Sequence, residues 1–374
     1  MIQNVHLTLL MGPVVPVPVP REVVDALSSV KVVSGATDQN GFDLTFTLSS
    51  TSTLNTIMLL LPQIGPLFRV ILIVTMGGMP KTLIDGVVVE HSVSPDVESG
   101  RTTLTLRGRD LTTVMGLIEF TGLPYPAMPP EARVALIIAK YAMYGLIPLV
   151  IPSLFTDVPN PVEKIPVHQG TDLEYVRELA RQAGYVFYIT PGPVPGTNVA
   201  YWGPEIKIGI PQPALNVNMD AHTNVERLSF SLNGARGTLP IVYVQIKETK
   251  TAIPVPIPAV DILNPPLGII PVSQPNIEFL DDTAKMSFAQ AIATGLSRAS
   301  LSVDAVEGTG SLDVLRYGRI LEARGLVGVR GAGQAFDGLY YVKSVTHDLK
   351  RGEYKQSFSL TRNGLVSITP KVPV

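Results

Sequence analysis

Alternating apolar and polar residues near the C-terminus predict a β-strand with one buried face. Phe358 and Leu360 fall on one side of such a strand, whereas Ser357 and Ser359 fall on the other. A period of two is typical of a strand that packs one face on a core. Asp337–Leu365 is therefore predicted to be a β-hairpin whose return strand buries Phe358 and Leu360.

A similar pattern occurs much earlier, over Asp85–Leu111, where Leu104 and Leu106 alternate with polar residues. In both segments an Asp-Gly pair opens a run rich in β-branched and aromatic residues, and a glycine follows in the predicted turn. Asp85 and Asp337 lie 252 positions apart, and the two turn glycines have the same separation. The repeated hairpin predicts that one β domain occurs twice in the chain.

A second repeated pattern lies upstream of each hairpin. The predicted strand Val5–Leu10 leads into Pro16–Pro20, and the predicted strand Ile241–Ile246 leads into Pro254–Pro258. The order of strand, Pro-rich arm, helix and hairpin then appears twice. The alternative is that two unrelated antiparallel hairpins look alike, because Val-Pro alternation carries little information.

Helical spacing replaces the period of two after Leu111. Prolines precede a predicted helix over Glu131–Tyr144, and a glycine follows it. A second helix is predicted from a capping box of Thr171 with Glu174 to a stop at Gly184. Two strands should follow this helix, over residues 185–190 and up to residue 204. These elements predict a small α/β domain between the two β domains.

The predicted fold class is therefore α+β, mainly β, with three domains. We expect a first β domain over residues 1–110, an α/β domain over 111–215 and a second β domain over 216–374. Residues 251–275 contain seven prolines, which favours an extended arm or loop over a helix or a central strand. A helix is expected over about residues 282–300.

The composition is unusually apolar for a chain of 374 residues, with 45% hydrophobic and only 16% charged residues. Such a chain either buries much of its surface in an assembly or contacts a membrane. The most apolar stretch, residues 55–78, is interrupted by prolines, a glycine and Arg69. We therefore expect a helix over about 52–61 and a buried strand over about 68–76 in place of a membrane span. The N-terminus lacks the features of a signal peptide, so no Sec export is expected.

The sequence offers no recognisable catalytic, cofactor-binding or metal-binding motif. A net charge of −2 gives no sign of nucleic-acid recognition, and the absence of cysteine excludes disulfides and thiolate metal sites. His91 and His347 are predicted to be strand residues at a wet interface, and Asp281 and Asp282 to complement a helix dipole. Trp202 is interpreted as a packing anchor, with an aromatic platform for a sugar or base as the alternative. We expect no enzyme activity and no cofactor.

Three segments together resemble a known family. They are the helix start Thr171–Val176 with Gly184–Phe187 after it, the strand end Tyr201–Pro204, and the block Phe336–His347. Over roughly residues 110–365 the chain resembles the late control protein D family, the baseplate hub proteins of contractile-tailed phages. This family is similar to the N-terminal hub half of type VI secretion spike proteins.

The resemblance implies two tail-tube-like β-barrel or sandwich domains per chain and a homotrimer with a pseudo-six-fold ring. Such a ring adapts the six-fold tail tube to a three-fold central spike and passes DNA or cargo without specific nucleic-acid recognition. The implied partners are the tail tube protein, the tape measure protein and other baseplate proteins. The implied location is the baseplate of a virion tail, assembled in the host cytoplasm.

Because the sequence stops at Val374, shortly after the hairpin, we also expect the spike to be a separate protein. The alternative function is a tail-associated glycan-binding or cell-wall-degrading protein, with Trp202 as its aromatic platform.

Overall fold

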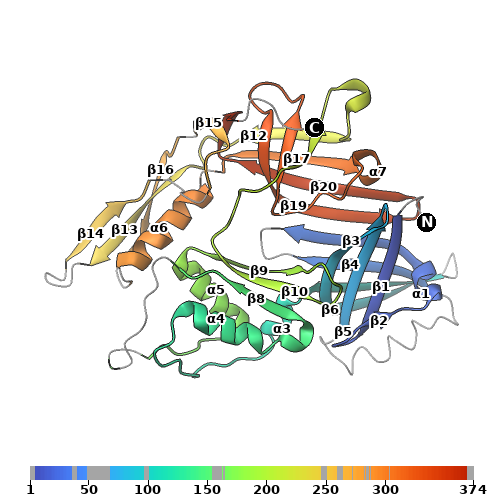
Figure 1. Ribbon diagram of the computed structural model, residues 1–374, viewed down its shortest axis with the longest axis horizontal. Helices are drawn as coiled ribbons and strands as arrows, with labels where there is room; N and C mark the ends of the chain where they lie inside the picture. The colour runs from blue at the N-terminus through green and yellow to red at the C-terminus, as the bar shows by residue number, and fades with distance from the viewer. Residues whose placement is uncertain are drawn as a thin grey trace.

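The computed structural model describes most of the chain. The described residues are 5–35, 40–48, 68–96, 101–153, 162, 165–245, 251–258, 264–271, 273–281, 283, 286, 288–302 and 304–368. Figure 1 shows a blue and cyan β unit below an orange and red one, with a green unit of helices and strands at the lower left.

The first β unit consists of seven strands and a short helix: β1 (Val5–Pro13), β2 (Val17–Pro18), α1 (Arg21–Ala26), β3 (Leu27–Gly35), β4 (Gly41–Leu48), β5 (Phe68–Met76), β6 (Met79–Asp96) and β7 (Arg101–Asp110). The middle unit consists of α3 (Thr112–Met115), α4 (Pro130–Ala139), the 3-10 turn η2 (Ala142–Tyr144), β8 (Leu146–Val150), α5 (Asp172–Ala183), β9 (Val186–Pro191) and β10 (Asn198–Gly203).

The second β unit consists of β11 (Gln212–Asn216), β12 (Arg227–Leu232), β17 (Val306–Asp313), α7 (Val314–Tyr317), β18 (Leu326–Arg330), β19 (Gly338–Lys350) and β20 (Glu353–Arg362). Between its β12 and β17 lie β13 (Thr238–Gln245), β14 (Ala252–Pro256), β15 (Gly268–Pro271), β16 (Asn276–Leu280) and α6 (Phe288–Ser302). The short strand β21 (Gly364–Ser367) follows β20 and pairs with β15.

The two β units have the same strand order. The first runs β3-β4-β7-β6-β5-β1 across its sheet, and the second runs β12-β17-β20-β19-β18-β11. When the six strands in each of these orders are numbered along the chain, leaving out β2 and the inserted strands β13–β16, both orders are 2-3-6-5-4-1. The units differ at one end, where β1 is antiparallel to β5 but β11 is parallel to β18. The shared order is what the predicted duplication requires.

The mainly β, α+β fold class is confirmed, with open sheets. In the described part of the chain no sheet closes on itself: the large sheet branches at β19 and ends at β2, β11 and β12, and the three smaller sheets each have two free ends. The domain limits at residues 110 and 215 stay predictions. The strand β11 already pairs with β18 of the second β unit, although it begins at Gln212.

The two hairpins share a β-bulge at the same place. In β6 the bulge leaves out Val89, because Val88 lies opposite Gly108 and the next pair is Glu90 with Arg107. In β19 it leaves out Lys343 in the same way, between the pairs Val342–Leu360 and Ser344–Ser359. A bulge re-aims a strand and increases its twist. Both units therefore bend their longest strand at corresponding positions.

This bulge corrects the predicted hairpin alignment. The return strands β7 and β20 correspond at a separation of 252 positions, but the first strands β6 and β19 correspond at 254. The difference arises in the connection, which has four residues between β6 and β7 and two between β19 and β20. Asp85 and Asp337 are therefore two positions out of register. Gly352, with φ 84°, occupies the tight turn, and its predicted partner Gly100 lies outside the described residues.

The predicted alternation in the return strands is confirmed. Phe358 and Leu360 are buried on the core side of β20, and Ser357 is exposed. Leu104 and Leu106 are equally buried in β7. These residues belong to one apolar core that continues from the first β unit into the second.

One strand pair fuses the two β units into a continuous sheet. The first part of β19 pairs with β18, and its second part, from Ser344 to Lys350, pairs with β3 of the first unit. Figure 1 shows β19 and β3 side by side where the two units meet. The chain therefore contains one complete junction between two similar units.

The prediction that the strands and Pro-rich arms upstream of the two hairpins are equivalent is wrong. The strand that contains Ile241 is β13, which forms a separate three-stranded sheet in the order β14-β13-β16, partly covered by α6. The counterpart of β1 in the strand order is β11. Alternating proline removes every second backbone donor, so β2 and β14 can each pair on one side only. Val-Pro alternation thus reports an edge strand and not a position in a repeat.

Most predicted boundaries hold, with two corrections. The buried strand β5 and the capping box of α5 are confirmed, and the strands within the described residues of 251–275, β14 and β15, are edge strands. The helix expected at 282 begins at Phe288, so Asp281 lies outside it. The helix after the prolines ends at Ala139 and continues only as a 3-10 turn before Gly145. The helix expected over 52–61 and Asp282 lie outside the described residues.

No helix in the described ranges has both the length and the apolar character needed to cross a bilayer.

The burial of Phe358 gives a stability prediction. Replacing Phe358 by Ala should lower the free energy of unfolding by about 3–5 kcal/mol, because it leaves a cavity in a shared core. The matched variant Ser357→Ala, one residue away on the exposed face, should change it by less than about 0.5 kcal/mol. Urea denaturation followed by circular dichroism measures both. Equal losses would show that the strand's faces are wrongly assigned.

Candidate functional site: buried polar networks and open sheet edges

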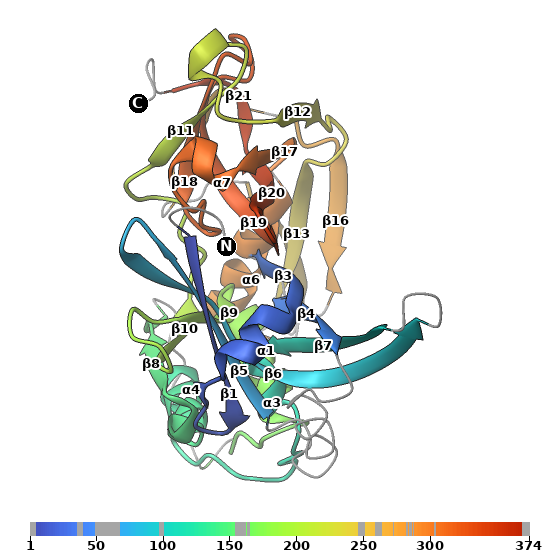
Figure 2. The ribbon, with the colours of Figure 1, turned by 90° about the vertical axis from the view of Figure 1, so that its right-hand side faces the viewer.

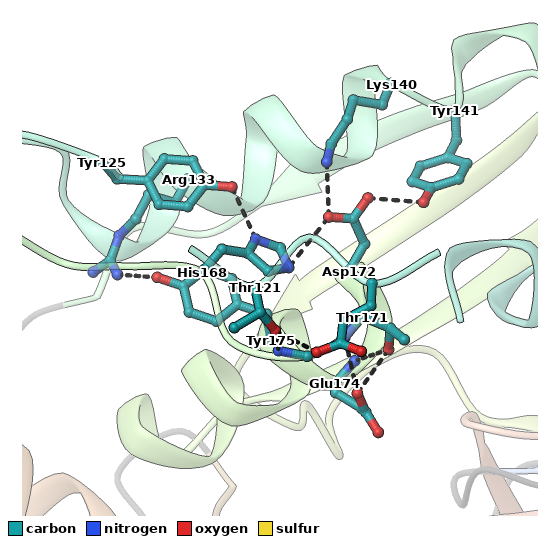
Figure 3. Close-up of polar contacts among 12 residues, drawn as sticks. Thr121, Tyr125, Arg133, Lys140, Tyr141, His168, Thr171, Asp172, Glu174 and Tyr175 are labelled. Carbon is teal, nitrogen blue, oxygen red and sulfur yellow. Dashed lines mark hydrogen bonds and ion pairs between the residues drawn. The ribbon is translucent and has the colours of Figure 1, made fainter. Parts of the chain in front are cut away.

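A buried carboxylate lies at the start of α5. The capping box is complete, because the Thr171 hydroxyl accepts from the Glu174 amide and the Glu174 carboxylate accepts from the Thr171 amide. This cap fixes Asp172 in the first helical turn. Lys140 Nζ lies 2.8 Å from one oxygen of Asp172, and the Tyr141 hydroxyl donates to the other at 2.8 Å (Figure 3). Burial and the adjacent carboxylate raise the pKa of Tyr141, so its hydroxyl stays a donor.

His168 extends this network toward two tyrosines. Its Nδ1 lies 3.0 Å from the Tyr125 hydroxyl, and its Nε2 lies 3.5 Å from Asp172. The imidazole packs against the Tyr175 ring at a centroid distance of 4.3 Å, and Arg133 donates to the Tyr175 hydroxyl at 2.6 Å (Figure 3). Burial lowers the pKa of His168, although Asp172 opposes this effect.

The network has the residue types of an acid–base site but not its accessibility. The side chains of His168 and Asp172 expose none of their surface. A substrate would have no approach to either group, and every contact described above joins residues of the middle unit, from α4 and its flanking segments to α5 and the loop before it. The network therefore holds the middle unit together.

One local signal of this network is present in the sequence, because His168 and Asp172 are four residues apart around a capping box. The partners from residues 125 to 141 carried no signal, since only the fold brings them close.

A second buried network joins the first β unit to the middle unit. Arg69 of β5 donates to both oxygens of Asp85 in β6, at 2.7 and 2.6 Å. The same guanidinium donates to the backbone carbonyls of Val14, Tyr144 and Gly196. Asn198 of β10 donates to Asp85 at 2.8 Å. Because both charges are fully buried, this set of bonds fixes how the two units pack.

The prediction that His347 lies at a solvated interface is wrong. Its side chain is buried in β19, with Nδ1 2.8 Å from the Tyr354 hydroxyl and 3.3 Å from the Gln356 amide. Burial, with a smaller effect of Lys81, lowers the pKa of His347 to about 3. His347 faces inward because it lies opposite Val32 of β3 at the junction of the two units. His91, by contrast, is exposed on β6.

Trp202 is a packing anchor, as predicted. Its ring is completely buried at the end of β10, donates from Nε1 to the carbonyl of Val176 at 3.4 Å, and meets Tyr185 edge-on. It offers no surface to a sugar ring in this structure. Within the described ranges, no three histidine or acidic side chains come close enough together to hold a metal ion.

Two accessible sheet edges in the described part of the chain are suited to binding a further strand. The strand β12 pairs only with β17, so its other edge is open in the described part of the chain. The outer part of β6, beyond its bulge, pairs with β7 but with no described strand on its other side, because the pairing with β5 ends at Val87. Both segments carry exposed apolar side chains, Leu232 at 44% and Val93 at 40%. Figure 2 shows β6 and β7 reaching away from the body of the molecule.

Solved structures of tail proteins have the same fold as this chain. A tail protein from Neisseria meningitidis MC58 superposes with a TM-score of 0.63 at 12% identity, over 96% of this chain and 98% of that one. A 43 kDa tail protein of prophage MuSo2 from Shewanella oneidensis gives 0.62 at 15% identity, over the same shares. The E. coli c3393 protein, a type VI secretion component described as similar to phage T4 gp27 and gp5, gives 0.54 at 10% identity over 93% and 76%.

No protein-family model matches the chain, and no curated protein matches its sequence. The likeness is thus one of fold, which the chain shares with phage and prophage tail proteins and with a type VI secretion component.

The buried ion pair predicts an asymmetric effect of mutation. Replacing Asp85 by Ala should lower the free energy of unfolding by about 3–5 kcal/mol, because it leaves the Arg69 charge buried without a carboxylate. The control is Glu90→Ala, also in β6, which removes an exposed ion pair with Arg107 of β7 and should cost less than about 1 kcal/mol. Chemical denaturation measures both, and a small loss for Asp85→Ala would contradict the assigned role.

His347 predicts a dependence of stability on acid. Its pKa is about 3 when folded and 6.5 when unfolded, so the unfolded state binds the extra proton below pH 6.5. Stability is therefore complete above about pH 6.5 and falls toward pH 3, with a slope of up to about 1.4 kcal/mol per pH unit. Denaturation midpoints between pH 7 and 4 should fall less steeply for His347→Gln than for the native chain. The exposed control His91→Gln should keep the native slope, and three identical slopes would contradict the prediction.

Proposed function

We propose that this chain is a structural hub of a contractile-tail baseplate and that it works as a homotrimeric ring. The observation that supports the proposal is the pair of β units with one strand order, 2-3-6-5-4-1, fused side by side through β3 and β19. Three such chains carry six similar units. A three-fold assembly can then present a six-fold face to a tail tube and a three-fold face to a central spike.

Surface chemistry supports a large assembly. Only 16% of the residues are charged, and exposed apolar side chains occur on both β units and on the inserted sheet, such as Val93, Leu232 and Phe279. Obligate interfaces bury about 2,000–5,000 Å² and are more apolar than other protein surface. Burial against other copies and other tail proteins accounts for an apolar excess that a free monomer would leave in water.

The proposed partners follow from this role. They are a tail tube protein on one face, a separate central spike protein on the other, and the tape measure protein and other baseplate proteins around them. The proposed location is the baseplate of a virion tail, after assembly in the host cytoplasm. DNA or cargo passes through the ring without specific recognition, in keeping with a net charge of −2.

The role is proposed to be non-enzymatic. The histidine and aspartate that resemble an acid–base pair, His168 and Asp172, are fully buried and bonded within the middle unit. The alternative of a glycan-binding or wall-degrading protein depended on Trp202 as a platform, and that ring is buried beneath other side chains. No observation on the described residues favours it.

Mass in solution tests the proposal. The purified chain should have three times its own mass of 40.2 kDa by light scattering, and this value should not change over a ten-fold range of concentration. A constant trimer mass, followed by a three-fold image of the particle at the end of a tail, would support the hub. A stable monomer, a hexamer, or a species that cleaves cell-wall glycan would overturn it.

A further inference from the structure

The junction between the two β units shows how a strand of one unit adds to the sheet of the next. At this junction β3, an end strand of the first unit's order, adds to the outer part of β19 beyond its bulge. Val32 lies opposite His347 and Val30 opposite Leu349, and all four side chains are buried. At this junction an end strand of one unit thus adds to the outer part of the neighbouring unit's longest strand.

The same two elements occur a second time without a partner. In the strand order, β12 is the counterpart of β3, and β6 is the counterpart of β19. The edge of β12 away from β17 and the edge of β6 beyond Val87 are both unpaired in the described part of the chain. An exposed edge presents unsatisfied backbone groups that bind a further strand.

The ladders inside each unit fix which residues correspond. Phe42 lies opposite Gly108 in the first unit, and Gly308 lies opposite Leu360 in the second. Since β7 and β20 correspond at 252 positions, Gly308 is the counterpart of Phe42. Val32 pairs with Phe42, and Phe230 pairs with Gly308. Phe230 is therefore the counterpart of Val32, and β3 and β12 correspond at 198 positions.

We propose that β12 of one copy adds antiparallel to the outer part of β6 in a second copy, in a defined register. Within the chain, Val32 of β3 lies opposite His347 of β19. Their counterparts are Phe230, 198 positions after Val32, and Val93, 254 positions before His347. The proposed contact therefore places Phe230 opposite Val93 of the second copy. By the same rule, Leu232 lies opposite His91 and Leu228 opposite Pro95. The inference rests on the proposed ring and specifies the contact that closes it.

The side-chain pattern of the two edges agrees with this register. On β12 the larger side chains at 228, 230 and 232 alternate with Ser229 and Ser231, and on β6 the residues at 91, 93 and 95 alternate with Ser92 and Ser94. The proposed register places serine opposite serine and the larger side chains opposite one another. Shifting it by one residue would oppose serine to apolar groups along the whole contact.

The backbone of β12 is oriented for this contact. The amide of Asn233 donates to the carbonyl of Ala305 on the β17 side, at 2.9 Å. Backbone groups in an antiparallel strand alternate in direction. The amides of Leu228, Phe230 and Leu232 therefore point toward the open edge, where β6 of the second copy would lie. The occupant is a second copy because the chain itself carries both the open β12 edge and the open β6 edge that the junction requires.

Cysteine cross-linking tests the register in a chain that has no cysteine of its own. The double variant Ser231→Cys with Ser92→Cys places two thiols on directly opposed residues of different copies, within the Cα separation of about 4.4–6.8 Å that a disulfide needs. The control, Ser229→Cys with Ser92→Cys, shifts one thiol by two residues and out of reach. All three serines are exposed, so the fold should be unaffected.

With an added oxidant, the matched pair should give covalent dimers and trimers on a non-reducing gel, on the order of ten-fold more than the shifted pair. A second matched pair, Ser229→Cys with Ser94→Cys, should behave like the first. A trimeric mass without cross-linking, or with stronger cross-linking of the shifted pair, would overturn this contact and leave the hub proposal intact. A monomeric mass without cross-links would overturn both.

Discussion

The pairing of β3 with β19 is the interaction on which the architecture depends. It turns two separate sheets into one and lets Val32 of the first unit and His347 of the second share a dry interior. The bulge at Lys343 makes this possible, because it bends β19 so that its two parts can pair with different partners, β18 and β3. An unpaired strand edge is a liability in water, and the chain satisfies one such edge internally.

Polar groups buried elsewhere serve the same end by fixing the middle unit against the sheet. The Arg69–Asp85 pair is fully desolvated, and only its further bonds to Asn198 and to three backbone carbonyls compensate for that cost. Asp172 is compensated in the same way by Lys140 and Tyr141. Each network therefore holds the middle unit in one packing geometry, which the proposed assembly with repeated contacts requires.

The sequence predicted those features whose cause is local. The period of two placed Phe358 in the core, and the capping box placed the start of α5, because both depend on neighbours a few residues away. Prediction from the sequence failed where contacts are distant in the chain. The burial of His347 depends on β3, more than 300 residues earlier. The strand β11 is too short for its pattern to identify it as the counterpart of β1. The different lengths of the two hairpin connections hid the true alignment of β6 with β19.

A reconstruction of the assembled ring, viewed along its axis, tests the central claim most directly. It should show six similar β units in alternation, joined by six β-strand contacts, three within chains through β3 and β19 and three between chains. A ring in which the second β units project away from the axis, or in which the sheet ends at the boundary of each chain, would contradict it.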